Sequence, residues 1–148
     1  MKKVMFLCTG NSCRSQIAEG FAREFAKDII EPHSAGLSPA GLNALAVRVM
    51  REVDIDISEQ KSKPIDEELL KTMDITITLC DNAAESCPRT PPEIKRLHWS
   101  IKDPAKAQGT EEEVLDEFRK ARDEIEQRVK NLVMRVRNGS ISEETVIS

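Results

Sequence analysis

The stretch that most constrains the fold is an apolar run, Val4 to Leu7, that stops at Cys8 and is followed by a loop of small residues. Four consecutive apolar residues predict a strand that is buried on both faces, as in a parallel sheet. A helical pattern begins near Arg14, so the stretch predicts a strand, a short loop and a helix N-terminus. Backbone N–H groups and the partial positive charge of a helix N-terminus together bind anions.

The loop after Cys8 carries the residues that an anion site needs. Gly10 lets the backbone approach closely, and Asn11 tolerates a left-handed conformation. Arg14 adds a fork of donors that matches a tetrahedral oxyanion. This positive environment favours the thiolate of Cys8, which we interpret as a nucleophile aimed at a bound oxyanion, rather than as a buried cysteine that only packs. The predicted substrate-binding residues are Thr9, Gly10, Asn11, Ser12, Cys13, Arg14 and Ser15.

Apolar patterns along the rest of the chain alternate between strand and helix. The further predicted strands are 29–35, 75–79 and 97–101, and the predicted helices are 14–26, 38–50 with Ser38 as its N-cap, 64–71, and 110–138 after a capping box at Thr110. This alternation predicts one three-layer α/β domain over residues 1–139, with a four-stranded parallel sheet and helices on both faces. Residues 140–148 are predicted to form a flexible C-terminal tail.

Three reactive side chains follow the ends of different predicted strands. Cys8 ends the first strand, Cys80 directly follows the third, and Asp103 comes shortly after the fourth. Ligands of parallel sheets bind beyond the carboxyl ends of the strands. We therefore expect the three side chains to gather at one edge of the sheet.

Composition excludes several classes of function. The net charge of −4 provides no basic field for nucleic acid, and no apolar stretch approaches the length of a membrane span or a signal sequence. We expect a cytoplasmic monomer with reduced thiols. The four cysteines lack the paired spacing of zinc ligands, so no metal site is predicted.

Several segments resemble the thioredoxin-coupled arsenate reductases of the low-molecular-weight protein tyrosine phosphatase superfamily. They are Cys8 to Glu19, Val53 to Ser58, the block from Leu79-Cys80-Asp81 to Cys87-Pro88, His98-Trp99 and Asp103-Pro104-Ala105. The resemblance implies a phosphatase-like fold and arsenate detoxification through three cysteines: Cys8 attacks arsenate, and Cys80 and then Cys87 form the disulfide. It also implies thioredoxin as the electron donor, with no tightly bound cofactor. The predicted catalytic residues are Cys8, Arg14, Cys80, Cys87 and Asp103.

Two other functions remain open at this stage. A phosphatase would use the same Cys8, with Asp103 protonating the leaving oxygen, and it would need no second thiol. The phosphatases of this superfamily usually carry a tyrosine after the Asp-Pro pair, whereas Ala105 stands there and the chain has no tyrosine. The other alternative is an oxyanion-binding or phospho-carrier module, which would leave Asp103 and the paired cysteines without a purpose.

The resemblance also bears on a cation. Some of these reductases carry a potassium site, and its ligands match Asn11, Glu19 and Ser34. The fourth matching position is Lys63. An ammonium there would repel potassium and pair with Glu19, so we expect no bound metal. The helical pattern alone places Glu19 off the apolar stripe, as a solvated charge.

Overall fold

A computed structural model describes residues 1–80 and 90–139. Cys87 and the predicted tail, 140–148, lie outside the described residues. The strands are β1 (Lys2–Cys8), β2 (Ile30–Gly36), β3 (Ile75–Thr78) and β4 (Lys95–His98). The helices are α1 (Arg14–Ala26), α2 (Ala44–Arg51), α3 (Glu67–Leu70) and α5 (Glu111–Asn138), with a 3-10 turn, η1, at Pro104–Lys106.

The four strands form one parallel sheet, as the alternating pattern predicts, and their order in the sheet is β2-β1-β3-β4. Cys8 of β1 pairs with Gly36 of β2, and Leu7 pairs with Thr78 of β3. Thr78 in turn pairs with His98 of β4. This register brings the carboxyl ends of all four strands to the same edge of the sheet.

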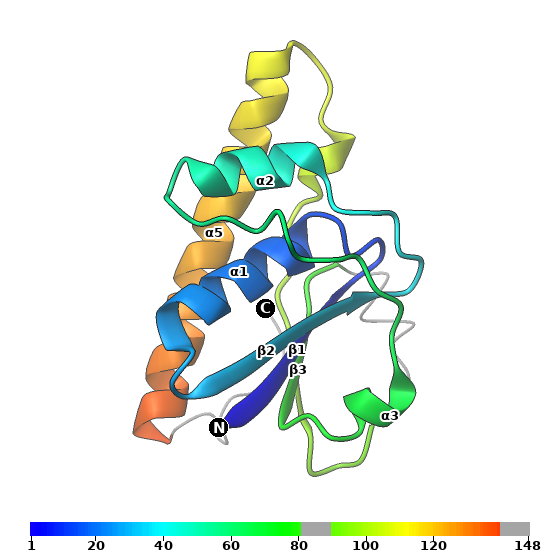
Figure 1. Ribbon diagram of the computed structural model, residues 1–148, viewed down its shortest axis with the longest axis vertical. Helices are drawn as coiled ribbons and strands as arrows, with labels where there is room; N and C mark the ends of the chain where they lie inside the picture. The colour runs from blue at the N-terminus through cyan, green and yellow to red at the C-terminus, as the bar shows by residue number, and fades with distance from the viewer. Residues whose placement is uncertain (81–89, 140–148) are drawn as a thin grey trace.

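The side chains of β1 alternate between two apolar layers. Val4 and Phe6 enter the large core that α1, α2 and α5 build on one face, whereas Met5 and Leu7 pack with Leu70 on the other. Figure 1 shows α5 running along the molecule near α1, with the short α3 apart from both. The prediction of helices on both faces of the sheet is therefore confirmed, and no helix in the described part of the chain is long and apolar enough to span a membrane.

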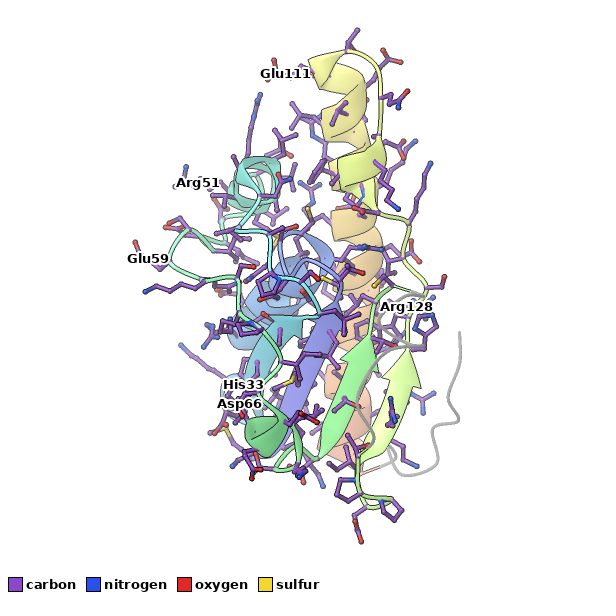
Figure 2. All side chains as sticks on the ribbon, turned by 90° about the vertical axis from the view of Figure 1, so that its right-hand side faces the viewer. His33, Arg51, Glu59, Asp66, Glu111 and Arg128 are labelled. Atoms are coloured by element: carbon purple, nitrogen blue, oxygen red, sulfur yellow. The ribbon has the colours of Figure 1, made fainter. Side chains whose placement is uncertain are left out.

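The long helix begins and ends as its sequence predicts. Thr110 and Glu113 form the capping box, and Gly139 closes the helix in a left-handed conformation with φ of 73°. Figure 2 shows that α5 extends past the end of the sheet at Glu111.

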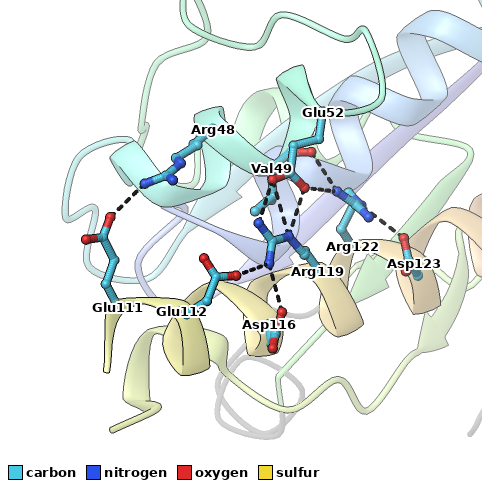
Figure 3. A network of polar contacts seen from close by, with 9 residues as sticks. All are labelled: Arg48, Val49, Glu52, Glu111, Glu112, Asp116, Arg119, Arg122 and Asp123. Carbon is cyan, nitrogen blue, oxygen red and sulfur yellow. Dashed lines mark hydrogen bonds and ion pairs between the residues drawn. The ribbon is translucent and has the colours of Figure 1, made fainter. Parts of the chain in front are cut away.

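Charged residues join α5 to α2 (Figure 3). Glu52 accepts hydrogen bonds from Arg119 at 2.8 Å and from Arg122 at 2.8 Å, and Arg122 also donates to the carbonyl of Val49 at 2.9 Å. The hydrogen bond from Arg119, with Arg122 in support, lowers the pKa of Glu52 to about 2. The network therefore contains a carboxylate that stays ionised at any physiological pH.

Three predicted boundaries are wrong. The second helix starts at Ala44 with Asn43 as its N-cap, so Ser38 caps nothing, because the backbone of 38–43 bonds to the loop after β1 instead. The third helix spans only 67–70, with Asp66 as its N-cap. The fourth strand is Lys95–His98 rather than 97–101. Buried Trp99 and Ile101 extend the apolar pattern, and their N–H groups still bond to the carbonyls of Thr78 and Leu79, but the strand begins two residues earlier and ends at His98.

Candidate active site

A cleft of about 930 Å³ opens at the carboxyl ends of the strands. Its lining includes eight predicted site residues: Cys8, Thr9, Gly10, Ser12, Cys13, Arg14, Cys80 and Asp103. Ala40, Ser100, Ile101, Lys102 and Lys106 complete the lining. The two other predicted loop residues, Asn11 and Ser15, are completely buried beneath the cleft. The chain thus brings the reactive groups of β1, β3 and the segment after β4 into one hollow.

Cys8 ends β1, and its sulfur lies 2.8 Å from the Ser15 hydroxyl oxygen. Neighbouring contacts fix the direction of the other hydrogen bond that Ser15 makes. The backbone N–H of Lys63 donates to Asn11 Oδ1 at 2.9 Å, so the other end of that amide, Nδ2, is the donor to Ser15 Oγ at 2.8 Å. Ser15 therefore accepts from Asn11, and when Cys8 is a thiolate, which has no hydrogen to give, the Ser15 hydroxyl donates to its sulfur. A hydroxyl donor at this distance stabilises the thiolate.

The loop between β1 and α1 turns its carbonyl groups away from the cleft. Three of these carbonyls accept from the following segment: Ser38 N–H to Thr9 O at 2.8 Å, Ala40 N–H to Gly10 O at 2.9 Å, and Asn43 N–H to Ser12 O at 3.0 Å. The N–H and C=O of one peptide unit point in opposite directions. The N–H groups of these peptides consequently face the opposite side of the loop, where an oxyanion can accept from them.

The close backbone approach involves Gly36 rather than Gly10. A Cβ on Gly36 would lie 2.7 Å from the carbonyl oxygen of Thr9 and 2.8 Å from the N of Asn11, whereas one on Gly10 would meet nothing nearer than 3.4 Å. Asn11 adopts the expected left-handed conformation, with φ of 47°. The position of the loop therefore depends on a glycine in β2, and no local sequence motif predicts this dependence.

Arg14 begins α1, and the segment after β4 holds its guanidinium. One terminal nitrogen donates to the carbonyl of Ile101 at 2.8 Å, and the other lies 3.5 Å from Asp103 Oδ2. The second carboxylate oxygen of Asp103 accepts from the N–H of Ala105 at 3.0 Å, at the start of η1. Both side chains are therefore fixed at the wall of the cleft, with the acid next to the cationic fork.

Two further cysteines lie at the cleft. Cys80 is buried, packs with Cys8 and Leu37, and its sulfur lies 3.2 Å from the Thr9 hydroxyl. Cys13 is also buried, and burial raises the pKa of its thiol to about 11. Cys13 therefore stays protonated at neutral pH, which agrees with its interpretation as a packing residue.

The expectation that Glu19 is a solvated charge is wrong. Glu19 is only 5% exposed, and its carboxylate accepts from the Ser34 hydroxyl and from Arg23, because this side of α1 faces β2. Lys63 does not pair with it: the Lys63 ammonium donates to the carbonyl of Lys61 at 2.6 Å. Among residues 1–80 and 90–139, His, Cys, Asp and Glu side chains form no group of three that could hold a metal ion.

Sequence reasoning also missed polar residues beneath the loop. Gln16 is completely buried and donates to Asn11, and Gln60 donates to Gln16. The Ser62 hydroxyl donates to the Gly10 carbonyl at 3.0 Å. Glutamine and serine in a helix and a polar connection carry no recognisable signal, so only the fold reveals these contacts.

Comparison with known proteins agrees with this geometry. Residues 3–142 match the family model described as low molecular weight phosphotyrosine protein phosphatase. An arsenate reductase of Bacillus licheniformis is 55% identical over 129 residues, which are 87% of this chain and 93% of that protein. A solved structure described as an arsenate reductase in the phosphate binding state is 37% identical, with a TM-score of 0.76, and covers 92% of this chain and 99% of that one.

A more distant structure, a thioredoxin-dependent arsenate reductase of Corynebacterium glutamicum, shares the fold. Its TM-score is 0.78 at 24% identity, over 94% of this chain and 63% of that one. The family model and the closely similar curated protein together cover nearly all of the described residues. The chain therefore belongs to the low-molecular-weight phosphotyrosine phosphatase family and, within it, to the arsenate reductases.

Proposed function

We propose that this protein reduces arsenate to arsenite through three cysteines and that thioredoxin then reduces the disulfide that forms in the protein. The observation that carries the proposal is the pair of buried thiols, Cys8 and Cys80, which pack together beside an anion loop. A phosphatase needs only the first of them. The similarity to arsenate reductases, including one described in a phosphate binding state, supports an oxyanion of that shape as the substrate.

The first step is attack of the Cys8 thiolate on arsenic. The loop N–H groups and Arg14 bind the arsenate oxygens, and the Ser15 hydroxyl holds the thiolate until it reacts. An As–S bond forms and an As–O bond breaks. Asp103, next to Arg14 at the wall of the cleft, gives the departing oxygen a proton, so that it leaves as water.

The second step moves two electrons to arsenic. The Cys80 thiolate attacks the Cys8 sulfur, an S–S bond forms, and the As–S bonding pair stays on arsenic, which leaves as arsenite. Cys87 then attacks Cys80, which frees Cys8 and moves the disulfide to Cys80 and Cys87. Reduction of this disulfide by the dithiol of thioredoxin closes the cycle, so the net reaction consumes arsenate and two thiols and yields arsenite, water and one disulfide.

The decisive experiment supplies arsenate, thioredoxin, thioredoxin reductase and NADPH to the purified protein and follows arsenate-dependent NADPH loss. Cys8→Ser should abolish this activity and any hydrolysis of an aryl phosphate, because both need the same nucleophile. Cys80→Ala and Cys87→Ala should abolish arsenate turnover yet spare the hydrolysis. Full thioredoxin-linked turnover by Cys87→Ala would contradict the relay, and hydrolysis without arsenate reduction in the wild type would favour a phosphatase.

A further inference from the structure

A cluster of side-chain amides beneath the anion loop has no part in the reaction steps above. Gln16, in the first turn of α1, is completely buried, and Gln60 approaches it from the connection between α2 and α3. We propose that Gln16 is a positioning residue that sets the shape of the anion loop and that Gln60 orients Gln16. This inference rests on the anion-binding part of the proposed function and extends it to residues that touch neither the oxyanion nor the reacting sulfur.

The hydrogen bonds of Gln16 have only one possible direction. Its Nε2 donates to the backbone carbonyls of Asn11 and Lys61, both at 3.0 Å, and to Asn11 Oδ1 at 3.1 Å. A backbone carbonyl can only accept, so the group that faces both carbonyls must be the NH₂ end of the amide. Two hydrogens serve three acceptors, and Gln16 thereby holds both oxygens of Asn11 from one side.

Gln60 fixes the other end of this amide in the same way. Its Nε2 donates to the backbone carbonyl of Gln16 at 3.0 Å and to Gln16 Oε1 at 2.8 Å. The backbone carbonyl again leaves only one orientation for the Gln60 amide. Gln16 Oε1 is therefore occupied as an acceptor, which prevents the Gln16 amide from turning over.

These contacts give one chain of hydrogen bonds, which is directed towards the nucleophile when Cys8 is a thiolate. It runs from Gln60 to Gln16, Asn11, Ser15 and Cys8. Asn11 is the residue in this chain whose conformation needs support, because asparagine tolerates the left-handed φ of 47° but more often has a negative φ. If Asn11 relaxed, its amide would release Ser15 and the adjoining peptide would turn its N–H away from the oxyanion. Gln16 therefore affects two properties of the site together, thiolate stabilisation and anion affinity.

Gln16→Met tests this inference because it keeps the side-chain length and removes the donors. The protein carries Cys80→Ser and Cys87→Ser, so that the disulfides of the proposed relay cannot form, and peptide mass spectrometry follows alkylation of Cys8 by iodoacetamide. The charged residues that line the cleft with Cys8 remain in every variant: Arg14, Lys102, Asp103 and Lys106. The pH dependence of the alkylation rate reports the thiolate, and protection by inorganic phosphate reports the anion site.

We expect Gln16→Met to weaken the protection of Cys8 by phosphate roughly tenfold, because a displacement of the loop donors by well below 1 Å has an effect of this size. The pH midpoint of alkylation should rise in the same variant. Gln60→Met leaves all Gln16 donors present, so it should change both readouts in the same direction by less. In the double variant the effects should not add, because Gln60 acts through Gln16.

Val129→Ala is the control for a general loss of stability, since Val129 is buried in α5. It should lower the unfolding temperature and leave both Cys8 readouts unchanged. If Gln16→Met and Gln60→Met kept phosphate protection and the pH midpoint at the values of the parent protein, the positioning role would be wrong. If phosphate failed to protect Cys8 in the parent protein itself, the anion site, and with it the proposed function, would be wrong instead.

Discussion

Gly36→Ala should displace the anion loop, although Gly36 lies in a strand and not in the loop itself. The added methyl would lie 2.7 Å from the Thr9 carbonyl oxygen, 2.8 Å from Asn11 N and 2.9 Å from Asn11 Cβ. Two of these three atoms belong to the backbone, so the loop as a whole must shift. Such overpacking costs about 1–3 kcal/mol of stability. A loop moved by about half an ångström should also lose roughly tenfold in affinity for phosphate, or about 1.4 kcal/mol.

Urea unfolding and calorimetric titration with inorganic phosphate measure the two effects separately. Val129→Ala is the control for stability alone, because Val129 is completely buried in α5. That variant should lose stability and bind phosphate as the wild type does. Unchanged phosphate affinity in Gly36→Ala, with the protein folded, would refute the argument that Gly36 sets the position of the loop.

Three further predictions concern separate parts of the molecule. Arg14→Lys should lower arsenate kcat/KM at least about 100-fold in the NADPH-coupled assay, since an ammonium cannot reproduce the planar fork; activity within threefold of the wild type would contradict this. Glu52→Gln should lower the free energy of unfolding by about 1 kcal/mol at pH 7. The pKa of the Glu52 carboxyl is lowered from its ordinary value of 4.5 to about 2, so the carboxylate contributes its full stabilisation at any pH above 4.5. In urea titrations at decreasing pH, the difference in stability between wild type and variant should therefore disappear as the pH falls towards 2. Potassium should raise activity and melting temperature no more than equal sodium does, because Arg23 and Ser34 already occupy the Glu19 carboxylate; a specific potassium effect would overturn this expectation.

The sequence predicts the sheet and the anion loop well because both depend on local patterns. The apolar run before Cys8, the small residues after it and the helix at Arg14 are sufficient for a strand, a loop and a helix N-terminus. The capping box at Thr110 and the glycine at 139 likewise act within a single helix, and both ends of α5 are correct.

Two of the errors involve contacts between segments that are distant in the chain. Ser38-Pro39 has the local pattern of a helix start, yet the backbone of Ser38 bonds to Thr9 and the helix begins six residues later. Glu19 lies off the apolar stripe but meets Ser34 of β2 and is buried. Whether a helical side chain beside a parallel sheet is buried depends on the sheet residues that it contacts. The pattern of apolar residues in the helix alone does not contain that information.

The order of the strands explains which group can take which role in the proposed relay. Neighbouring strands lie about 4.8 Å apart, and a disulfide requires Cα atoms about 4.4–6.8 Å apart. β3 is the neighbour of β1, so Cys80, just beyond β3, can reach the sulfur of Cys8 without rearrangement of the sheet. β4 is one strand further away, too far for a thiol there to pair with Cys8, but its following segment places Asp103 across the cleft beside Arg14. In the proposed relay, the segment after β3 therefore carries the second thiol and the segment after β4 carries the proton donor.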